Sequence, residues 1–437
     1  MNPSRKDSVR VALLGCGTVG GGVLRLLREN GPRLASRVGA PIEVSHVLVR
    51  NLDKERVEEC RREWLTTDPD AVFGDSGVDV VVEVMGGEEP ARGYIERAIQ
   101  AGKAVVTANK LLIAQHGPDL VESAVSQKVD LAFEASVGGG IPIIRTLREA
   151  LASDSVASVH AILNGTSNYI LTRMRDAGLS FETALGEAQK LGYAEADPSL
   201  DVDGHDAAQK LTVMAMLAFG ARVNTRDMLV EGIRNLDETD FRLADRFGFT
   251  LKHLGIGHDR GERIELRVHP ALVKKTSVLA NIDGVLNGVF IMGRALGPCL
   301  LVGRGAGDMP TAVSVVADLV DVARARLGGE PGLMTRGIAL NDRPLLGQNE
   351  IETRYYLRFD VGDHPGVVGS IASALGTEGV SIEQMVQDGR AVRAGEAVPV
   401  CIITHSCTEG SVLRALTTVR SKPFLRGAPR ILRIEEA

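Results

Sequence analysis

The sequence is poor in cysteine, in long apolar runs and in clustered positive charge, and each shortage excludes a class of protein. The five cysteines are odd in number and scattered, so they fit neither a disulfide framework nor a zinc site. This cysteine usage favours a reducing, cytoplasmic location. The longest apolar run, LTVMAMLAFGA from Leu211, is too short to span a bilayer, so we expect a buried helix there and no membrane partner.

The charge pattern excludes a further class of partner. The chain carries 50 basic and 56 acidic residues, for a formal net charge of -6, without a basic run or a stripe of basic and aromatic residues. Nucleic acid is therefore not an expected partner. What the chain does have is length, with 437 residues, and an apolar fraction of 44% with 49 glycines, which suits an α/β enzyme of two or three domains.

The first part of the chain alternates apolar, β-branched runs with helical patterns. The runs cover residues 9–17, 42–50, 78–86, 103–109 and 129–136. This alternation predicts a parallel sheet with helices on both faces, so the fold class is α/β, with a Rossmann-like dinucleotide-binding domain over residues 1–136. A strong helical pattern over residues 307–328 is expected to return to this domain and complete it.

The rest of the chain divides into three segments. Residues 137–306 mix long helical stretches with strands, which predicts an α+β substrate and oligomerisation domain. Residues 329–352 are rich in glycine, proline and charge, which indicates a linker. Residues 353–437 give the succession strand, helix, strand, strand, helix, strand, which predicts a small independent module with a ferredoxin-like fold.

The segment GCGTVGGG, after the first predicted strand, has the GxGxxG spacing at Gly15, Gly17 and Gly20, with Thr18 and Val19 between them. The first glycine suits a tight turn, the second lets the backbone approach a pyrophosphate, and the third lets the following helix pack on the strand. A glycine-rich turn without a ligand is the alternative. The strand before the motif and the helix after it favour dinucleotide binding.

Two further strand ends are expected to reach the dinucleotide, because ligands of open α/β sheets bind beyond the carboxyl ends of the strands. The second strand ends at Arg50, with Lys54 nearby, where an acid would suit a free ribose hydroxyl. The arginine favours a 2′-phosphate and hence NADP(H), with NAD(H) or an ordinary exposed arginine as the alternatives. Thr107 and Lys110, in VTANK, are expected to border the nicotinamide.

The stretch GYAEADPSLDVDGHDAAQK, residues 192–210, crowds carboxylates ahead of one lysine. Its acids are Glu195, Asp197, Asp201, Asp203 and Asp206. Lys210 follows Asp206 by four residues, so one helical turn would place both side chains on one face. An exposed ion pair worth about 0.2–0.5 kcal/mol is the ordinary result of that spacing. The order of the acids favours instead a binding site for a small zwitterion.

The pattern A-x3-G-Y…D-P-x2-D-V-x-G-x-D-x3-K in residues 188–210 resembles the signature of the homoserine dehydrogenases. GCGTVGGGV, TANK, EASVGGGIPII, LNGTSNYIL and GRGAGDMPTA resemble further segments of that family, in the same order along the chain. The resemblance implies NAD(P)H-dependent reduction of L-aspartate 4-semialdehyde to L-homoserine, on the route to threonine and methionine.

The resemblance also implies roles for the charged residues. Lys210 would act as the general acid, and Lys110 would polarise the substrate oxygen beside the nicotinamide. Glu195 and Asp206 resemble the family's acids for the substrate ammonium, and Asp201 would bind substrate or support those acids. These roles suit the chemistry, because an aldehyde oxygen that becomes an alkoxide needs a proton donor.

Three glycine- or asparagine-containing segments complete the expected site. In EASVGGGIP the resemblance implies a monovalent cation, sodium, held by Glu134 and by the backbone carbonyls of Val137, Gly139 and Ile141, which are hard oxygen ligands. A glycine hinge between domains is the alternative. NGTSNY, residues 164–169, is expected to line the substrate pocket, and GRGAG is expected to bring Gly307 close to the cofactor.

The tail FDVGDHPGVVGSIASALGTEGVSIEQMVQ resembles an ACT domain, an amino-acid-sensing module. Asp363 and Ser381 are candidate contacts to an effector, with a plain helix cap as the alternative for Asp363. Threonine, the end product of the pathway branch, is the expected effector, and a module that only supports assembly is the alternative. Because ACT modules pair side by side, we expect a homodimer or a homotetramer.

Two rival functions remain at this point. Another ACT-bearing dehydrogenase, acting on a hydroxy acid, would use a catalytic histidine, and no histidine here has that context. A non-catalytic, nucleotide-bound amino-acid sensor would not require Lys110 and Lys210 together at the domain junction.

Overall fold

The apolar runs of the N-terminal domain fold into a six-stranded parallel sheet in the order β3-β2-β1-β4-β5-β6. The strands are β1 (Val9–Leu14), β2 (Ile42–Leu48), β3 (Leu65–Thr66), β4 (Val80–Glu83), β5 (Ala104–Thr107) and β6 (Leu131–Ala132). This order confirms the predicted Rossmann-like sheet. The computed structural model describes residues 7–389 and 397–436, so the outer bounds predicted at residues 1 and 437 lie outside the described residues.

Helices cover both faces of this sheet because the side chains of each strand alternate between two apolar clusters. Val11 and Leu13 of β1 pack on one side, and Ala12 and Leu14 pack on the other. The first face carries α1 (Thr18–Val38) and α11 (Asp308–Leu327), and the second carries α2 (Pro69–Phe73), α3 (Ala91–Gln100) and α4 (Lys110–Gln127). The helix predicted to return to the first domain therefore does so.

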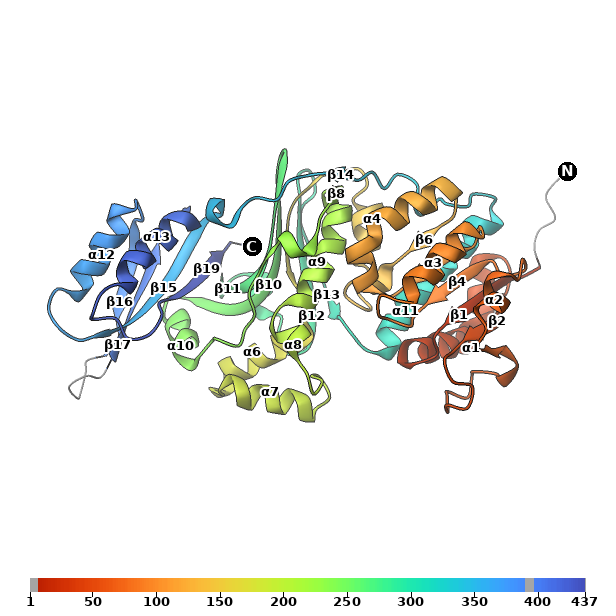
Figure 1. The fold of residues 1–437 in the computed structure, drawn as a ribbon, viewed down its shortest axis with the longest axis horizontal. Coiled ribbons are helices and arrows are strands. Elements are labelled where there is room, and N and C mark those ends of the chain that lie inside the picture. Colours follow the sequence, from red (N-terminus) through yellow and green to blue (C-terminus); the bar gives the residue numbers. More distant parts are fainter. Residues whose placement is uncertain (1–6, 390–396, 437) are drawn as a thin grey trace.

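A mixed sheet of eleven strands runs through the rest of the molecule, with the main order β13-β12-β7-β10-β11-β19-β15-β17-β16. In Figure 1 the six-stranded sheet lies at one end of an elongated molecule and the C-terminal module at the other. The middle strands are β7 (Val156–Ile162), β9 (Leu229–Val230), β10 (Phe249–Arg260), β11 (Arg263–Lys274), β12 (Leu286–Gly293) and β13 (Gly297–Arg304). The middle helices are α5 (Ile143–Arg145), α6 (Gly165–Ala177), α7 (Phe181–Lys190), α8 (Ser199–Val202), α9 (His205–Ala218) and α10 (Glu238–Arg246).

The C-terminal module has the predicted succession of elements. They are β15 (Glu352–Gly362), α12 (Val367–Thr377), β16 (Ile382–Gln387), β17 (Ala397–Thr404), β18 (Cys407–Thr408), α13 (Glu409–Arg420) and β19 (Arg430–Glu435). Its strands pair antiparallel in the order β19-β15-β17-β16. Within the described residues no helix is long and apolar enough to cross a membrane.

The prediction that this module is independent is wrong, because its strand β19 pairs in parallel with β11 of the substrate domain. Arg433 of β19 is 1% exposed and binds two carboxylates at the joint. It donates to Glu409 of α13 at 2.7 and 2.5 Å and to Glu231 of the substrate domain at 2.9 and 3.0 Å. The edge of one sheet thus continues into the other, and a buried ion pair locks the junction.

The segment predicted as a linker is anchored along its length. Asp130, beside β6, accepts the backbone N–H groups of Gly332 and Met334 at 3.0 and 2.8 Å. Further along, β14 (Asn341–Asp342) pairs with β8 (Ala221–Arg222). The linker therefore crosses the molecule as a fixed strap that contacts both the first and the second domain.

We expect Arg433→Met to lower the stability of the whole chain, because it leaves Glu409 and Glu231 without their shared cation. Loss of one partner from a buried ion pair costs about 3–5 kcal/mol. Arg263→Met is the matched control, since Arg263 and Glu350 form an exposed pair worth less than about 1 kcal/mol. Thermal unfolding of the two variants compares them. Equal melting temperatures would contradict a locked joint.

Candidate active site

The glycine motif forms the turn between β1 and α1. Gly15 has a φ of +97°, and a Cβ there would lie 3.1 Å from the Val84 carbonyl oxygen. A Cβ on Gly20 would lie 2.6 Å from the Gly15 carbonyl oxygen, so α1 packs on the turn without room for a side chain. Gly17 instead faces open space, with no atom within 4 Å of its would-be Cβ. The tight turn and the close packing are confirmed, and the open position leaves room for a ligand.

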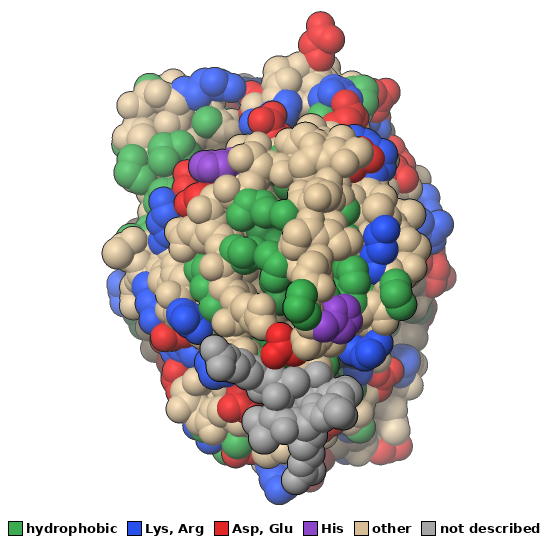
Figure 2. All heavy atoms as spheres, turned by 90° about the vertical axis from the view of Figure 1, so that its left-hand side faces the viewer, with side chains coloured by type: hydrophobic (Ala, Val, Ile, Leu, Met, Phe, Trp, Pro, Cys, Tyr) green, Lys and Arg blue, Asp and Glu red, His purple; other side chains and the backbone are tan. Residues whose placement is uncertain are grey.

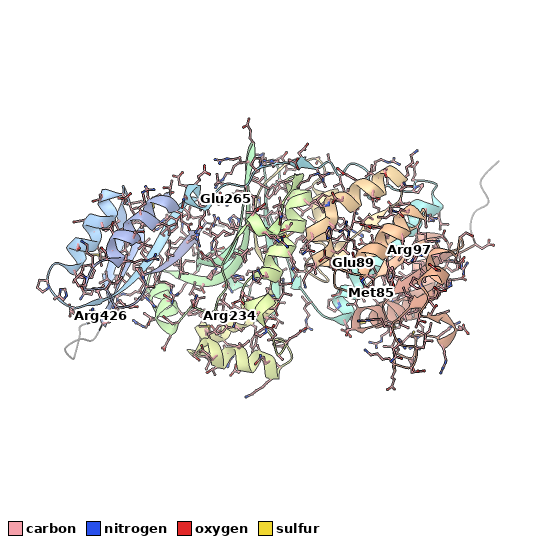
Figure 3. The ribbon with its side chains drawn as sticks, in the orientation of Figure 1. Met85, Glu89, Arg97, Arg234, Glu265 and Arg426 are labelled. Atoms are coloured by element: carbon pink, nitrogen blue, oxygen red, sulfur yellow. The ribbon has the colours of Figure 1, made fainter. Side chains whose placement is uncertain are left out.

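A buried acid joins the carboxyl ends of β4 and β5. The Glu83 carboxylate accepts the N–H groups of Met85 and Gly86 at 2.7 and 3.1 Å and the Thr107 hydroxyl at 2.6 Å. Met85, labelled in Figure 3, also packs against the glycine turn, so this network connects Thr107 to the motif. Sequence reasoning named Thr107 and missed Glu83, although an acid inside the apolar run VVVEV is a signal that could have found it.

The centre of the site is one carboxylate shared by two lysines. Lys110, the first residue of α4, places its Nζ 2.9 Å from Oδ1 of Asp206, and Lys210, on α9, places its Nζ 2.8 Å from Oδ2. The side chain of Asp206 is 4% exposed and that of Lys210 is 10% exposed. The ordinary alternative, an exposed ion pair at this spacing, is therefore wrong. The two lysines meet at the domain junction as predicted.

The electrostatics of this group follow from its burial. Burial alone would raise the pKa of Asp206, but the charges of Lys210 and Lys110 outweigh it and hold the pKa well below its ordinary value. Asp206 therefore stays ionised. Lys110 and Lys210 both line the adjoining cavity, where their ammonium groups suit a developing oxyanion.

Asn164 fixes the two acids of the site relative to each other. It precedes α6, where its side-chain oxygen accepts the Ser167 N–H at 2.7 Å. Its Nδ2 donates to Asp201 at 2.7 Å and to Asp206 at 2.8 Å. Burial raises the pKa of Asp201, and the nearby charge of Asp206 raises it further. The sequence placed NGTSNY at the pocket, and the structure gives its first residue a definite part there.

The remaining acids of residues 192–210 lie in different places, two in the loop before α9 and one at the cavity. Asp197 accepts the Ser199 N–H at 3.1 Å and forms a turn ahead of α8. Asp203 pairs with Arg234, which is labelled in Figure 3, at 2.5 and 3.0 Å. Glu195 is exposed but belongs to the lining of the active-site cavity. The crowding of acids thus divides between the site and the loop that carries it.

A cavity of about 560 Å³ opens between the two domains at the lysine pair. Its lining includes Lys110, Glu195, Asp201, Asp206, Lys210 and Gly307, so the predicted catalytic and substrate-binding residues all meet there. One wall is backbone: a Cβ on Gly139 would lie 2.8 Å from the Gly305 carbonyl, so the segments EASVGGGIP and GRGAG pack together through glycines. Gly307 ends this wall, directly before α11.

Glu134 lies behind this wall, with its carboxylate directed at the start of α5. Its two oxygens accept the N–H groups of Ile144 and Arg145 at 2.9 and 2.8 Å. Burial raises the pKa of Glu134. The Gly139 carbonyl accepts the Ser314 hydroxyl at 2.6 Å, and Val137 and Ile141 are buried in the same segment.

The other predicted contacts lie outside the cavity. Arg50 and Lys54 are exposed on the loop after β2, at the carboxyl edge of the sheet. Asp363 and Ser381 are exposed on the C-terminal module, and Asp363 accepts a hydrogen bond from Gln387 at 3.2 Å. Gly366, rather than Asp363, immediately precedes α12, so the interpretation of Asp363 as a plain helix cap is not supported.

A glycine turn on a parallel sheet of this order is built to hold a dinucleotide. Ammonium groups beside the adjoining cavity suit a reaction that creates negative charge on a substrate oxygen. The fold and the site therefore define the class of protein, a dinucleotide-dependent oxidoreductase with a separate substrate domain.

Comparison with known proteins narrows the class to one family. Residues 15–134 match the family model described as "Homoserine dehydrogenase, NAD binding domain", and residues 142–320 match "Homoserine dehydrogenase". The chain is 40% identical to the homoserine dehydrogenase of Neisseria gonorrhoeae over 431 residues, covering 98% of both chains. It is 41% identical to that of Synechocystis over 447 residues, covering 98% of this chain and 99% of the relative. The chain belongs to the homoserine dehydrogenase family.

Solved structures agree with this assignment. A homoserine dehydrogenase from Thiobacillus denitrificans superposes with a TM-score of 0.92 at 42% identity and covers 98% of each chain. The homoserine dehydrogenase of S. aureus superposes with a TM-score of 0.78 at 27% identity, and the match covers 98% of this chain and 100% of the other. Both matches include the C-terminal module, so the eleven-stranded sheet lies within the matched region.

The glycine turn yields a test that separates folding from binding. Gly20→Ala should destabilise the chain by about 1–3 kcal/mol, because its Cβ collides with the turn. Gly17→Ala should leave the melting temperature near that of the wild type and weaken dinucleotide binding, because its Cβ occupies the open side of the turn. Thermal unfolding and titration with NADPH measure the two effects. Unchanged binding by Gly17→Ala would contradict a pyrophosphate at this position.

Proposed function

We propose that the protein reduces L-aspartate 4-semialdehyde to L-homoserine with NADP(H) or NAD(H), and that the reaction takes place in the cavity between the domains. The observation that carries this proposal is the contact of Lys110 and Lys210, from different domains, with the carboxylate of Asp206. This contact speaks against a non-catalytic sensor, which would not require two lysines from different domains at one buried carboxylate. The bound cofactor would supply a hydride to the aldehyde carbon.

Lys210 is the proton donor in this proposal. Its ammonium group has three hydrogens, of which one bonds to Asp206 at 2.8 Å and one to the Leu163 carbonyl at 2.7 Å. The third is free to point toward a substrate oxygen in the cavity. Two fixed hydrogen bonds hold the Nζ in place, so the proton is aimed before the alkoxide forms.

Lys110 and the acids position the substrate. Lys110 is 34% exposed and contacts Oδ1 of Asp206, whereas Lys210 contacts Oδ2. Lys110 can therefore orient the substrate oxygen from the side of the cofactor domain. Asp206 already contacts both lysines and Asn164. We therefore assign the substrate ammonium first to Glu195 and Asp201, with the Asp206 charge behind them.

Lys210→Ala should lower kcat by about 10²–10⁴-fold, because the alkoxide loses its proton donor. Binding of NADPH should stay near the wild-type value, since the glycine turn is untouched. Lys190→Ala, which removes an exposed lysine on α7, is the control for loss of one charge. Steady-state kinetics with homoserine and NADP measure the effect. Near-normal turnover by Lys210→Ala would overturn the assignment.

The preference for NADP(H) rests on Arg50 and Lys54. Both are exposed cations on the loop after β2, the strand whose end receives the adenosine ribose in sheets of this order. An arginine fork matches the oxygens of a 2′-phosphate.

Arg50→Ala should weaken NADP(H) binding about 10–100-fold, the loss expected for a hydrogen bond to a charged group. NAD(H) binding should change little, because that cofactor has no phosphate to pair. Arg61→Ala, on the same loop and exposed, is the control. Cofactor titrations of both variants decide the point. An equal loss for NAD(H) and NADP(H) would assign Arg50 a structural part.

We also propose that EASVGGGIP holds a sodium ion. The donor types suit a hard cation, since they combine a buried carboxylate with backbone carbonyls of one segment. The ion would share the oxygens of Glu134 and Gly139 with the N–H and hydroxyl groups that they accept. Glu134 together with the carbonyls of Val137, Gly139 and Ile141 would hold the ion. When bound, the ion would fix the glycine segment that forms the cavity wall. The alternative is that the same segment is a glycine hinge between the domains and binds no ion.

The C-terminal module is proposed to be an ACT domain that binds threonine. Its strand order and its β-α-β-β-α-β succession support the ACT assignment. Asp363 directly follows β15, and Ser381 directly precedes β16. β19 carries an effect on the module directly into β11, which provides a physical route to the catalytic domain.

Threonine should inhibit the wild-type enzyme, and Asp363→Ala or Ser381→Ala should raise the concentration needed while leaving kcat unchanged. Point variants are required because truncation before β15 would remove β19 from the sheet and unpair Arg267 and Glu231. Initial rates against threonine concentration test the proposal. Inhibition unaffected by either variant would place the effector site elsewhere, and no inhibition would favour a module that only supports assembly.

A homodimer or homotetramer is proposed from the two open ends of the eleven-stranded sheet. At one end β13 exposes Leu300 (39%) and Val302 (46%), and at the other β16 exposes Met385 (45%). Figure 2 shows hydrophobic side chains gathered at the centre of the face formed by the C-terminal module, with charged residues around them. Use of one end would give a dimer and use of both a tetramer. The cytoplasmic location stays a prediction.

A further inference from the structure

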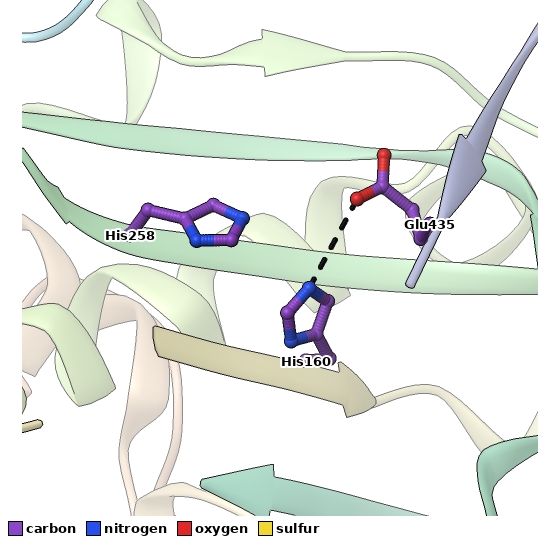
Figure 4. A group of neighbouring side chains, drawn as sticks. All are labelled: His160, His258 and Glu435. Carbon is purple, nitrogen blue, oxygen red and sulfur yellow. Dashed lines mark ion pairs between the residues drawn. The ribbon is translucent and has the colours of Figure 1, made fainter. Parts of the chain in front are cut away.

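Two histidines and a glutamate meet where the substrate domain joins the C-terminal module. His160 comes from β7, His258 from β10 and Glu435 from β19 (Figure 4). One ligand atom of each lies within 4.8 Å of the other two. The rings of the histidines are 5.1 Å apart, edge to face, and the Nε2 of His160 is 3.9 Å from Oε2 of Glu435.

His160 is buried without the hydrogen bonds that a buried imidazole normally makes. It is 3% exposed, and its Nδ1 has no hydrogen-bond partner in the part of the chain that the structure describes. Its Nε2 is too far from Glu435, at 3.9 Å, for a hydrogen bond. Buried polar groups are almost always paired, so an unpaired one points to a bound water or ion.

Both imidazoles are in the form that binds metal. Burial lowers the pKa of His160 below its ordinary value. Burial, followed by the neighbouring His160, lowers the pKa of His258 to about 3. The rings are therefore neutral at physiological pH, and each has a nitrogen lone pair to donate.

The carboxylate of Glu435 has one oxygen in position to join them. Arg267 donates its close hydrogen bond through Nη1 to Oε1 and a longer one, at 3.3 Å, through Nη2 to Oε2, the oxygen that faces His160. Glu265 accepts hydrogen bonds from both Arg260 and Arg267. Two arginines are thus matched by two glutamates, so the surrounding ion pairs are balanced and no excess of positive charge repels a cation.

We propose that His160, His258 and Glu435 bind a divalent transition-metal ion of the zinc type, with water completing its coordination. Two imidazoles and one carboxylate are a donor set that zinc takes in proteins. Zinc–ligand distances of about 2.0–2.2 Å require the ligand atoms of the three side chains to move about 1 Å closer to one another. His258 is half-buried and can make this movement, and it gives the ion a path from solvent. The ion would tie β19 to β7 and β10.

This site is separate from the dehydrogenase reaction, so its test does not use activity. The full chain, freed of metal by a chelator and dialysed, is titrated with Zn²⁺ and with Co²⁺, and bound metal is measured by elemental analysis and by the visible absorption of Co²⁺. We expect one ion per chain and a higher melting temperature with zinc. His258→Gln and Glu435→Gln should each weaken zinc binding at least about 100-fold. Loss of a residue that only hydrogen-bonds to a metal ligand costs about 10–100-fold, and loss of a ligand itself should cost more.

Matched variants keep the test decisive. His364→Gln removes an exposed histidine of the C-terminal module and should bind zinc like the wild type. His258 is half-buried, so its variant is the one expected to keep the fold, and its melting temperature without metal checks this. Absence of stoichiometric zinc binding, or equal binding by the wild type and His258→Gln, would overturn the proposal and leave a water molecule as the partner of His160.

Discussion

The carboxylate of Asp206 is the constraint on which the site depends. It is buried, and a buried carboxylate is stable only if its charge is matched. The match comes from two lysines on helices of different domains, Lys110 on α4 and Lys210 on α9. The contact of Lys110 with Asp206 also joins the cofactor domain to the substrate domain at the cavity. The two lysines proposed for catalysis and the contact between the domains therefore share one carboxylate.

The rest of the fold serves that interaction from both sides. The parallel sheet places Thr107 and Lys110 at its carboxyl edge, where Glu83 fixes the loop after β4. The mixed sheet places Leu163 and Asn164 directly after β7, where they bond to Lys210 and Asp206. The same sheet continues through β11 and β19 into the C-terminal module, so the strands beside the site and those of the module belong to one sheet.

Much of this arrangement could be predicted from the sequence, because the signals are local. The strand and helix periods, the glycine spacing and the four-residue step from Asp206 to Lys210 each depend on neighbouring residues. The pairing of β19 with β11 could not be predicted, since both are apolar strands and nothing local distinguishes an open edge from a shared one. NGTSNY was placed at the pocket from the sequence, but the specific bonds of Asn164 to Asp201 and Asp206 could not be predicted, because those partners are distant in the sequence.

The most direct measurement of the central claim is a double-mutant cycle on kcat/KM with Lys110→Ala, Lys210→Ala and the double variant. If the two lysines act through one carboxylate on one substrate oxygen, their losses are strongly non-additive. The double variant should then be about as active as the worse single variant. Losses that multiply would contradict the account, because they would mean that the two lysines act independently.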